Sequence, residues 1–213
     1  MNNTFAQKLV SLLPASGKGL FNPWTDRCQF DDDRNGPQAR LDRLARHLDC
    51  EAGLILVGEA PGYQGCRYSG IAFTSERLLM EGSIPRIDAV SHRISTRNIP
   101  FSEPSATIVW KALYRFGVAE TTILWNALQM HPFRDGCPWS NRTPTDDEIA
   151  AGAASLRCLR ETYPTAKLIA VGRKAEHAIH TLGMRVDAAI RHPANGGATE
   201  FTMGLQRALA SMR

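Results

Sequence analysis

Short apolar runs alternate along this chain with longer segments in which apolar residues recur every three or four positions. Runs of the first kind are typical of buried strands, and the second spacing is typical of amphipathic helices. The predicted strands cover residues 53–57, 121–125 and 167–171, and residues 186–191 lead into a late loop. The predicted helices cover residues 39–48, 73–80, 105–116, 146–162, 173–182 and 200–213, with Ser75 as a cap of the second. Strands that alternate with helices predict an α/β fold, here a three-layer α/β/α sandwich with a central, mostly parallel sheet.

The length and composition of the chain predict a single domain over residues 1–213. With 213 residues, of which 43% are hydrophobic, the chain can bury an ample core. Turn-forming residues are frequent near the start, so residues 1–50 are predicted as an irregular arm followed by a helix. Residues 82–104 have mixed character and contain prolines, and we interpret them as an inserted loop.

Charge and cysteine content exclude several classes of protein. The five cysteines are scattered and form no Cys-x-x-Cys pair, which argues against a disulfide framework and against a zinc site. No apolar run reaches membrane-spanning length and no signal-peptide pattern is evident, so we expect a cytoplasmic protein that does not act at a membrane. The net charge of +4 permits DNA binding through a local patch but does not argue for it.

Three segments that follow predicted strands carry the candidate chemistry. Residues 58–62, Gly-Glu-Ala-Pro-Gly, end the first strand, Asn126 ends the second, and residues 192–197 read His-Pro-Ala-Asn-Gly-Gly. Ligands of open α/β sheets bind beyond the carboxyl ends of the strands, where these segments are expected to meet. Glycine lets the backbone approach a flat ligand closely, and Phe73 offers an aromatic face on which it can stack.

These three segments, in this order, resemble the uracil-DNA glycosylase superfamily. Residues 141–145, Asn-Arg-Thr-Pro-Thr, with Glu148 three positions on, add a fourth matching motif, and the resemblance spans about residues 54–201. Within the superfamily, the resemblance is strongest to the family 4-like class, whose first motif is Gly-Glu-Ala-Pro-Gly. The resemblance implies a DNA glycosylase that flips a deaminated base, uracil before others, out of DNA and hydrolyses its N-glycosidic bond in base excision repair. The implied partner is DNA that contains such a base, with no cofactor, no metal and no obligate protein partner.

The resemblance assigns roles to individual side chains. Phe73 would stack on the base, and Asn126 would present an amide that pairs with O4 and N3–H of uracil but not with the reversed pattern of cytosine. His192 would stabilise the charge that develops on O2, and Glu59 would orient or activate the attacking water. Three of these residues also have a structural interpretation: Phe73 as a core ring, Asn126 as a strand-end cap and His192 as a structural histidine before proline.

Further contacts follow from the matching loops. The residues expected to line the base pocket besides these are Gly58, Ala60 and Tyr63. The residues expected to contact the DNA are Pro61, Gly62, Ser69, Arg191, Asn195 and Gly196.

The chain departs from the family in two respects. Ala60 stands where the best-known uracil-DNA glycosylases have an aspartate, and the family 4-like class holds an iron–sulfur cluster for which this chain keeps only Cys28 near the N-terminus. His131 and Gly152 occupy the positions of two later cluster ligands, so we expect no cluster. The choice among uracil, hypoxanthine, xanthine and mismatched thymine stays open, because Tyr63 lies one place later than the tyrosine that excludes the thymine methyl group.

Two other functions fit parts of the sequence. The same pocket could belong to a reader that binds damaged bases with weak catalysis or none. A small-molecule hydrolase could use Cys66 as nucleophile with His192, although the sequence places no third member beside them.

Overall fold

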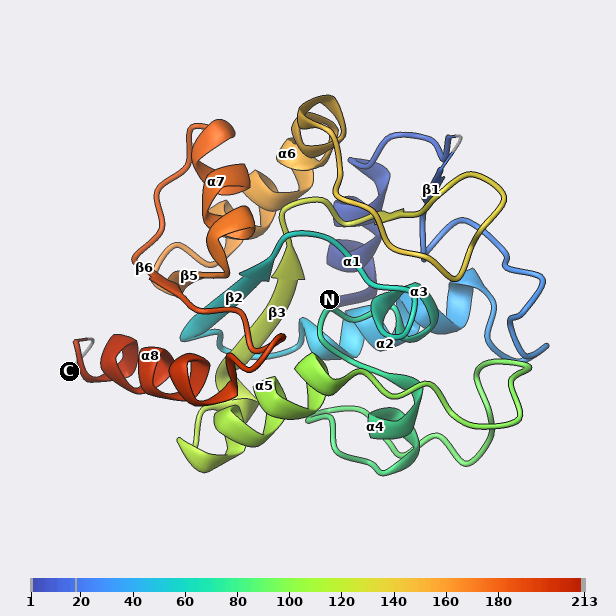
Figure 1. Ribbon diagram of the computed structural model, residues 1–213, viewed down its shortest axis with the longest axis horizontal. Helices are drawn as coiled ribbons and strands as arrows, with labels where there is room; N and C mark the ends of the chain where they lie inside the picture. The colour runs from blue at the N-terminus through green and yellow to red at the C-terminus, as the bar shows by residue number, and fades with distance from the viewer. Residues whose placement is uncertain (1, 18, 212–213) are drawn as a thin grey trace.

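A four-stranded parallel sheet forms the centre of the molecule (Figure 1). The computed structural model describes residues 2–17 and 19–211. The strands are β2 (Leu54–Gly58), β3 (Thr122–Asn126), β5 (Lys167–Val171) and β6 (Ala188–Ile190), in the order β3-β2-β5-β6. The register pairs Gly58 with Asn126 and Val171 with Ile190, so all four strands end at the same edge of the sheet.

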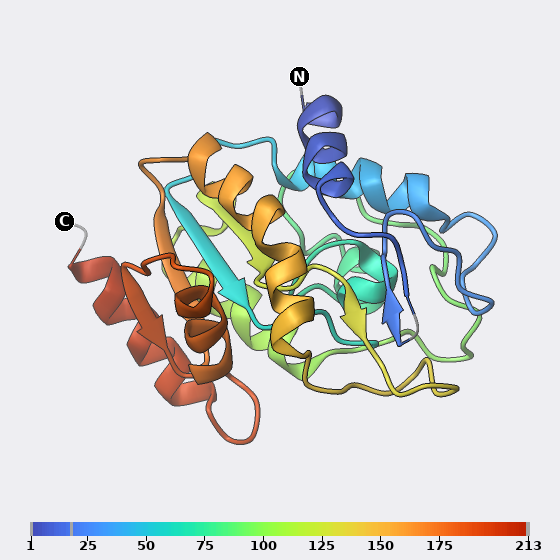
Figure 2. The same cartoon turned by 90° about the horizontal axis from the view of Figure 1, so that it is seen from above.

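Helices cover both faces of the sheet, because alternate strand residues point to opposite sides. In β2, Ile55 and Val57 join one core cluster, and Leu54 and Leu56 join the other. The first cluster takes in helices α1 (Asn2–Ser11), α2 (Pro37–His47), α6 (Asp146–Thr162) and α7 (Arg173–Thr181). The second takes in α4 (Glu76–Met80), α5 (Pro104–Arg115) and α8 (Ala198–Ala210) (Figure 2). This arrangement confirms the predicted α/β/α sandwich.

Most predicted elements are present, and α6 and β5 have the predicted bounds. The start of α6 is determined locally by a capping box, in which Thr145 Oγ1 accepts a hydrogen bond from Glu148 N and Glu148 accepts one from Thr145 N. The predicted last helix ends within the described residues at Ala210, and residues 212–213 lie outside them. Among the described residues, no helix has the length and apolar character needed to cross a bilayer.

Five short elements and one helix were not expected, among them strand β6, whose residues were predicted only to lead into the late loop. The arm that we predicted to be irregular contains α1, which contacts α2 and α6, and β1 (Leu20–Phe21), which pairs antiparallel with β4 (His131–Pro132). Helix α3 (Cys66–Ser69) and a 3-10 turn, η1 (Ala119–Thr121), are the others. The predicted helix over 73–80 begins at Glu76; Ser75 precedes it without a side-chain cap, and Phe73 has a φ of 48°.

A single buried carboxylate holds the predicted inserted loop, which contains no helix or strand between residues 83 and 103. Glu76 is fully buried and accepts hydrogen bonds from the guanidinium of Arg93, from Ser95 Oγ and from three backbone amides, those of residues 94, 95 and 101. Burial alone would raise the pKa of this carboxyl, but the hydrogen bonds to its charged form have the larger combined effect. The pKa of Glu76 is therefore lower than the ordinary value. The loop is therefore attached to α4 through a charged group.

We expect Glu76→Ala to lower the free energy of unfolding by about 2–3 kcal/mol, because several buried donors lose their acceptor. Urea unfolding followed by circular dichroism measures this change, with Glu81→Ala as the matched control. Glu81 belongs to an exposed ion pair with Arg77 on the same helix turn and should contribute less than about 0.5 kcal/mol. Since the pKa of Glu76 is lowered, its contribution is present above the ordinary value of 4.5 and is lost as the pH falls below it. Equal losses in the two variants would contradict this account.

Candidate active site

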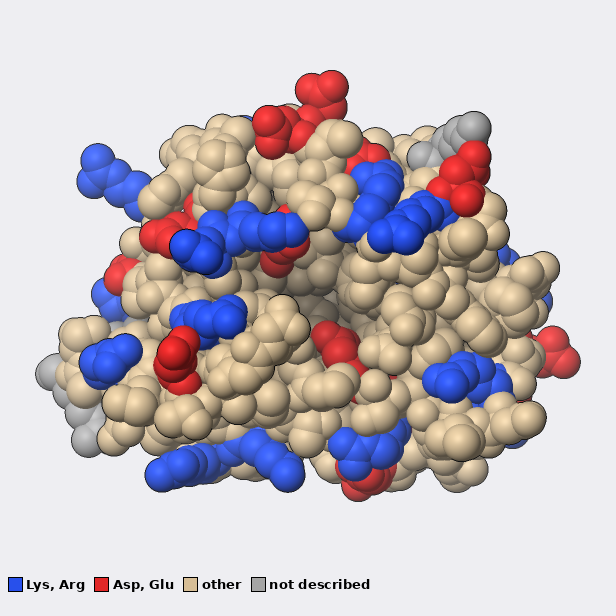
Figure 3. Space-filling view, viewed as in Figure 1, with Lys and Arg blue, Asp and Glu red and all other residues tan. Residues whose placement is uncertain are grey.

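A cavity of about 820 Å³ opens where the four parallel strands end. The last residues of all four strands line it, namely Gly58, Asn126, Val171 and Ile190. Loop residues 59–62 and 191–195 form further parts of its wall, together with Phe73 and the start of α7. Figure 3 shows the hollow at the centre of this face, with basic side chains around it. Its volume lies within the range of small-ligand pockets.

Phe73 and Asn126 meet at the end of β2, because residue 58 is glycine. A Cβ placed on Gly58 would lie 2.6 Å from Asn126 Oδ1 and 2.8 Å from Phe73 Cζ. Asn126 is only 5% exposed, yet no described protein group donates to or accepts from its carboxamide. A nearly buried amide without a protein partner has donors and acceptors available for a ligand.

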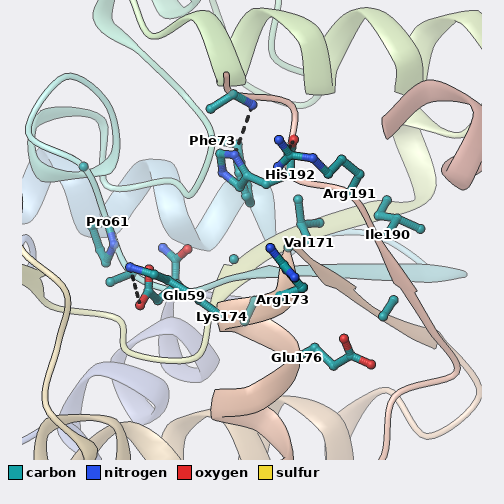
Figure 4. A pocket seen from close by; sticks show the side chains of 18 of the residues that line it. Glu59, Pro61, Phe73, Val171, Arg173, Lys174, Glu176, Ile190, Arg191 and His192 are labelled. Carbon is teal, nitrogen blue, oxygen red and sulfur yellow. Dashed lines mark hydrogen bonds and ion pairs between the residues drawn. The ribbon is translucent and has the colours of Figure 1, made fainter. Parts of the chain in front are cut away.

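His192 lies beside Phe73, with 6.0 Å between the ring centroids (Figure 4). Burial, with a smaller contribution from the charge of Arg191, lowers the pKa of the imidazole, which is therefore neutral at pH 7. The backbone N–H of Ala194 donates to His192 Nδ1 at 3.1 Å. Because Nδ1 accepts, the proton of the neutral ring is on Nε2, which can donate to a ligand.

Glu59 and Lys174 form an ion pair at the edge of the cavity, with 3.9 Å between Oε1 and Nζ (Figure 4). Burial raises the pKa of Glu59, and the charge of Lys174 opposes this shift. Lys174 Nζ also donates to Thr143 Oγ1 at 2.7 Å. Glu59 therefore combines partial burial with a cation that favours its charged form.

A second cleft of about 600 Å³ adjoins the cavity and is formed largely by the two predicted DNA-contacting loops. It is lined by Pro61 and Gly62 on one side and by Asn195 and Gly196 on the other. Basic residues stand on the walls of the cavity and the cleft: Arg142, Arg173, Lys174 and Arg191. Positive charge around such a groove suits a phosphate backbone.

Two predicted contact residues lie outside this site. Tyr63 lines neither the cavity nor the cleft; its ring packs edge-on against Phe101, at 6.0 Å between centroids. Ser69 is fully buried at the end of α3, where its hydroxyl donates to the carbonyl of Ile71. The prediction of Ser69 as a phosphate contact is therefore wrong, because α3 buries this side chain in the protein. Tyr63 is half-buried, and its role as a base contact stays a prediction.

The thiol-hydrolase interpretation also fails on geometry and charge. Cys66 lines the cavity but is only 2% exposed. Burial, with a further contribution from Glu103, raises the pKa of its thiol well above the ordinary value. A thiol that stays protonated is a poor nucleophile.

A network behind the first loop was not predicted. Arg67 Nη1 donates to His131 Nδ1 at 2.9 Å, so the proton of this neutral imidazole is on Nε2, which donates to Asn141 Oδ1 at 3.1 Å. The same Oδ1 accepts from the backbone N–H of Tyr63 at 3.0 Å. Burial lowers the pKa of His131 to about 3. This chain of bonds positions the loop after Gly62, and no local sequence signal indicates it.

The donor set near Cys28 does not fit an iron–sulfur cluster. Cys28 Sγ contacts Tyr68 Oη and Arg67 Nη2, each at 3.5 Å, and the Arg67 guanidinium stacks 3.8 Å from the ring centroid of Phe21. Within the part of the chain that the structure describes, no group of three or more His, Cys, Asp or Glu side chains could hold a metal. A guanidinium packed between aromatic rings and polar groups holds this region together instead.

Comparison with known proteins gives a family and a fold. A sequence model of the uracil DNA glycosylase superfamily matches residues 45–207. The crystal structure of wild-type Pedobacter heparinus SMUG2 superposes with a TM-score of 0.57 at 14% sequence identity, covering 98% of this chain and 97% of that chain. No curated protein sequence matches the chain.

Proposed function

The chain belongs to the uracil DNA glycosylase superfamily, and from this premise we propose that it is a monofunctional DNA glycosylase that removes a deaminated base from DNA in base excision repair. Uracil is the proposed first substrate. A base must leave the duplex before an enzyme can act on it, and the cavity beyond the strand ends is the site proposed to receive it.

The observation that carries this proposal is the unpartnered carboxamide of Asn126 beside the ring of Phe73. The amide can accept from N3–H and donate to O4 of uracil while the ring stacks on its face. Cytosine presents the opposite pattern at these two positions, so it would leave buried polar groups unpaired at a cost of about 1–3 kcal/mol each.

The proposed reaction is hydrolysis of the bond between C1′ and the base. As this bond breaks, negative charge accumulates on the base, and His192 Nε2–H donates to its O2 oxygen. Water adds its hydroxyl to C1′ and transfers its proton to Glu59, whose charged form is favoured by the ion pair with Lys174. Glu59 then releases this proton to solvent, and the departing base anion takes one proton from solvent.

The proposed test is release of free base from labelled single- and double-stranded oligonucleotides containing uracil, hypoxanthine, xanthine or mismatched thymine, followed by alkaline cleavage at the abasic site. Glu59→Gln is expected to lower the rate by about 10²-fold, because it removes the proton acceptor. The matched control is Glu176→Gln, which changes a carboxylate that lines the cavity but lies away from His192 (Figure 4). Lesion-specific binding without base release by the wild-type protein would favour the reader instead.

A further inference from the structure

The inserted loop contributes a carboxyl group to the cavity, in addition to those of Glu59 and Glu176. Glu103 lies at the end of this loop, directly before α5, and lines both the cavity and the adjoining cleft. Two residues earlier, the backbone N–H of Phe101 donates to Glu76 at 2.9 Å. The hydrogen bonds that hold the inserted loop to buried Glu76 therefore also restrain the position of Glu103.

The carboxyl of Glu103 packs against Gly65 and has no polar partner among the described residues. A Cβ placed on Gly65 would collide with Glu103 Oε2. Glu103 occupies the N-cap position of α5, but its side chain makes no capping hydrogen bond. Two other carboxyl groups described above do have polar partners: Glu59 forms an ion pair with Lys174, and Glu76 accepts several hydrogen bonds.

The surroundings favour the neutral form of Glu103. Glu103 is half-buried as a residue, but the burial of its carboxyl raises its pKa to about 7, and no cation offsets this shift. The titratable groups that line the cavity or cleft with Glu103 are the protonated thiol of Cys66, Glu59 with Lys174, neutral His192, and Arg142, which is occupied by Glu148 at 2.6 Å. Arg173, Glu176 and Arg191 also line the cavity, and Arg77 donates to Ser102 and Thr107 on either side of Glu103. A neutral carboxyl can donate a hydrogen bond to a carbonyl oxygen, whereas a carboxylate repels one.

We propose that protonated Glu103 donates a hydrogen bond to the base in the cavity and is a specificity-determining residue of the site, beside Asn126. This inference rests on the proposed function. A base with carbonyl oxygens, as deamination produces, is the ligand that such a donor fits. Deprotonation of Glu103 would remove the donor and place a second negative charge near Glu59 and the departing base anion.

The test measures binding and cleavage separately across pH. Binding uses fluorescence anisotropy with an oligonucleotide containing 2′-fluoro-2′-deoxyuridine, which resists hydrolysis, against a cytosine-containing control. For the wild type, the preference for the uracil oligonucleotide should fall about tenfold between about pH 6 and about pH 8, as a donor with a pKa near 7 is lost. Glu103→Gln, which keeps a donor but cannot titrate, should retain the preference at both pH values. Glu103→Ala should lose it at both.

Two further variants distinguish an effect of the position of the Glu103 carboxyl from a general effect on folding. Gly65→Ala keeps the carboxyl but displaces it, so it should resemble Glu103→Ala in binding, whereas Ser102→Ala, at an exposed neighbouring position, should match the wild type. A wild-type preference that does not change with pH, or a Glu103→Gln variant that follows the wild-type profile, overturns the inference while base release still supports the proposed function. Failure of the wild-type protein to release any base, with the pH-dependent preference intact, rejects the enzyme and keeps Glu103 as a recognition residue.

Discussion

Replacing Asn126 with alanine is expected to lower kcat/KM for uracil release by between about 30-fold and about 10⁴-fold. Two hydrogen bonds to the base would be lost, and each unpaired buried group costs about 1–3 kcal/mol, which corresponds to this range. The effect on the rate should be large because the amide is nearly buried. Among the described residues the amide has no hydrogen-bond partner, so its main role would be to bind the base.

The measurement is single-turnover base release from uracil and cytosine oligonucleotides, together with thermal unfolding of each variant. The matched control is Asn98→Ala, which removes an exposed asparagine of the inserted loop and should leave the rate unchanged. Asn126→Ala should also reduce the discrimination between uracil and cytosine. A variant that keeps both the rate and the discrimination would show that Asn126 is a structural strand-end residue.

Replacing His192 with alanine is expected to lower kcat by about 10²–10³-fold, the loss that follows removal of one donor aimed at a developing negative charge. The neutral ring is the donor here, and its pKa is lowered from the ordinary value of 6.5. Wild-type activity should therefore not fall as the pH decreases to 6.5, and the decrease should begin only at lower pH. His177→Ala, at an exposed position on α7, is the control with unchanged activity. An activity that rises as the imidazole becomes protonated would contradict the neutral donor.

The fold was predictable where signals are local and repeated. The strand at residues 54–58 is apolar throughout, and the strand at 167–171 is apolar after the exposed Lys167, because both faces of the sheet are covered. Helix α6 carries its own capping box. Helix α1 was missed because it is stabilised by packing against α2 and α6 rather than by signals in the arm itself. The end of each strand was predictable to within one or two residues, which was sufficient to place the candidate site at one edge of the sheet.

The candidate site was predictable only in part. Gly58 and Asn126 end strands and His192 follows one, so the parallel topology brings the three residues to the same edge of the sheet. Tyr63 and Ser69 lie in a stretch whose path depends on α3 and on the hydrogen bonds that join Arg67, His131 and Asn141, which are distant in sequence. Glu76 and Glu103 look like ordinary charged residues in the sequence, because their environments arise from contacts across the inserted loop.

The backbone of Phe73 has a consequence for the thermodynamics of binding. A bulky residue with a φ of 48° is held in a sparsely populated conformation, at a cost of about 1–3 kcal/mol that folding has already overcome. Gly58 and the neighbouring imidazole leave the ring little freedom to rotate. An aromatic ligand would thus meet a preorganised surface and lose little additional conformational entropy on stacking, so the association should be dominated by enthalpy.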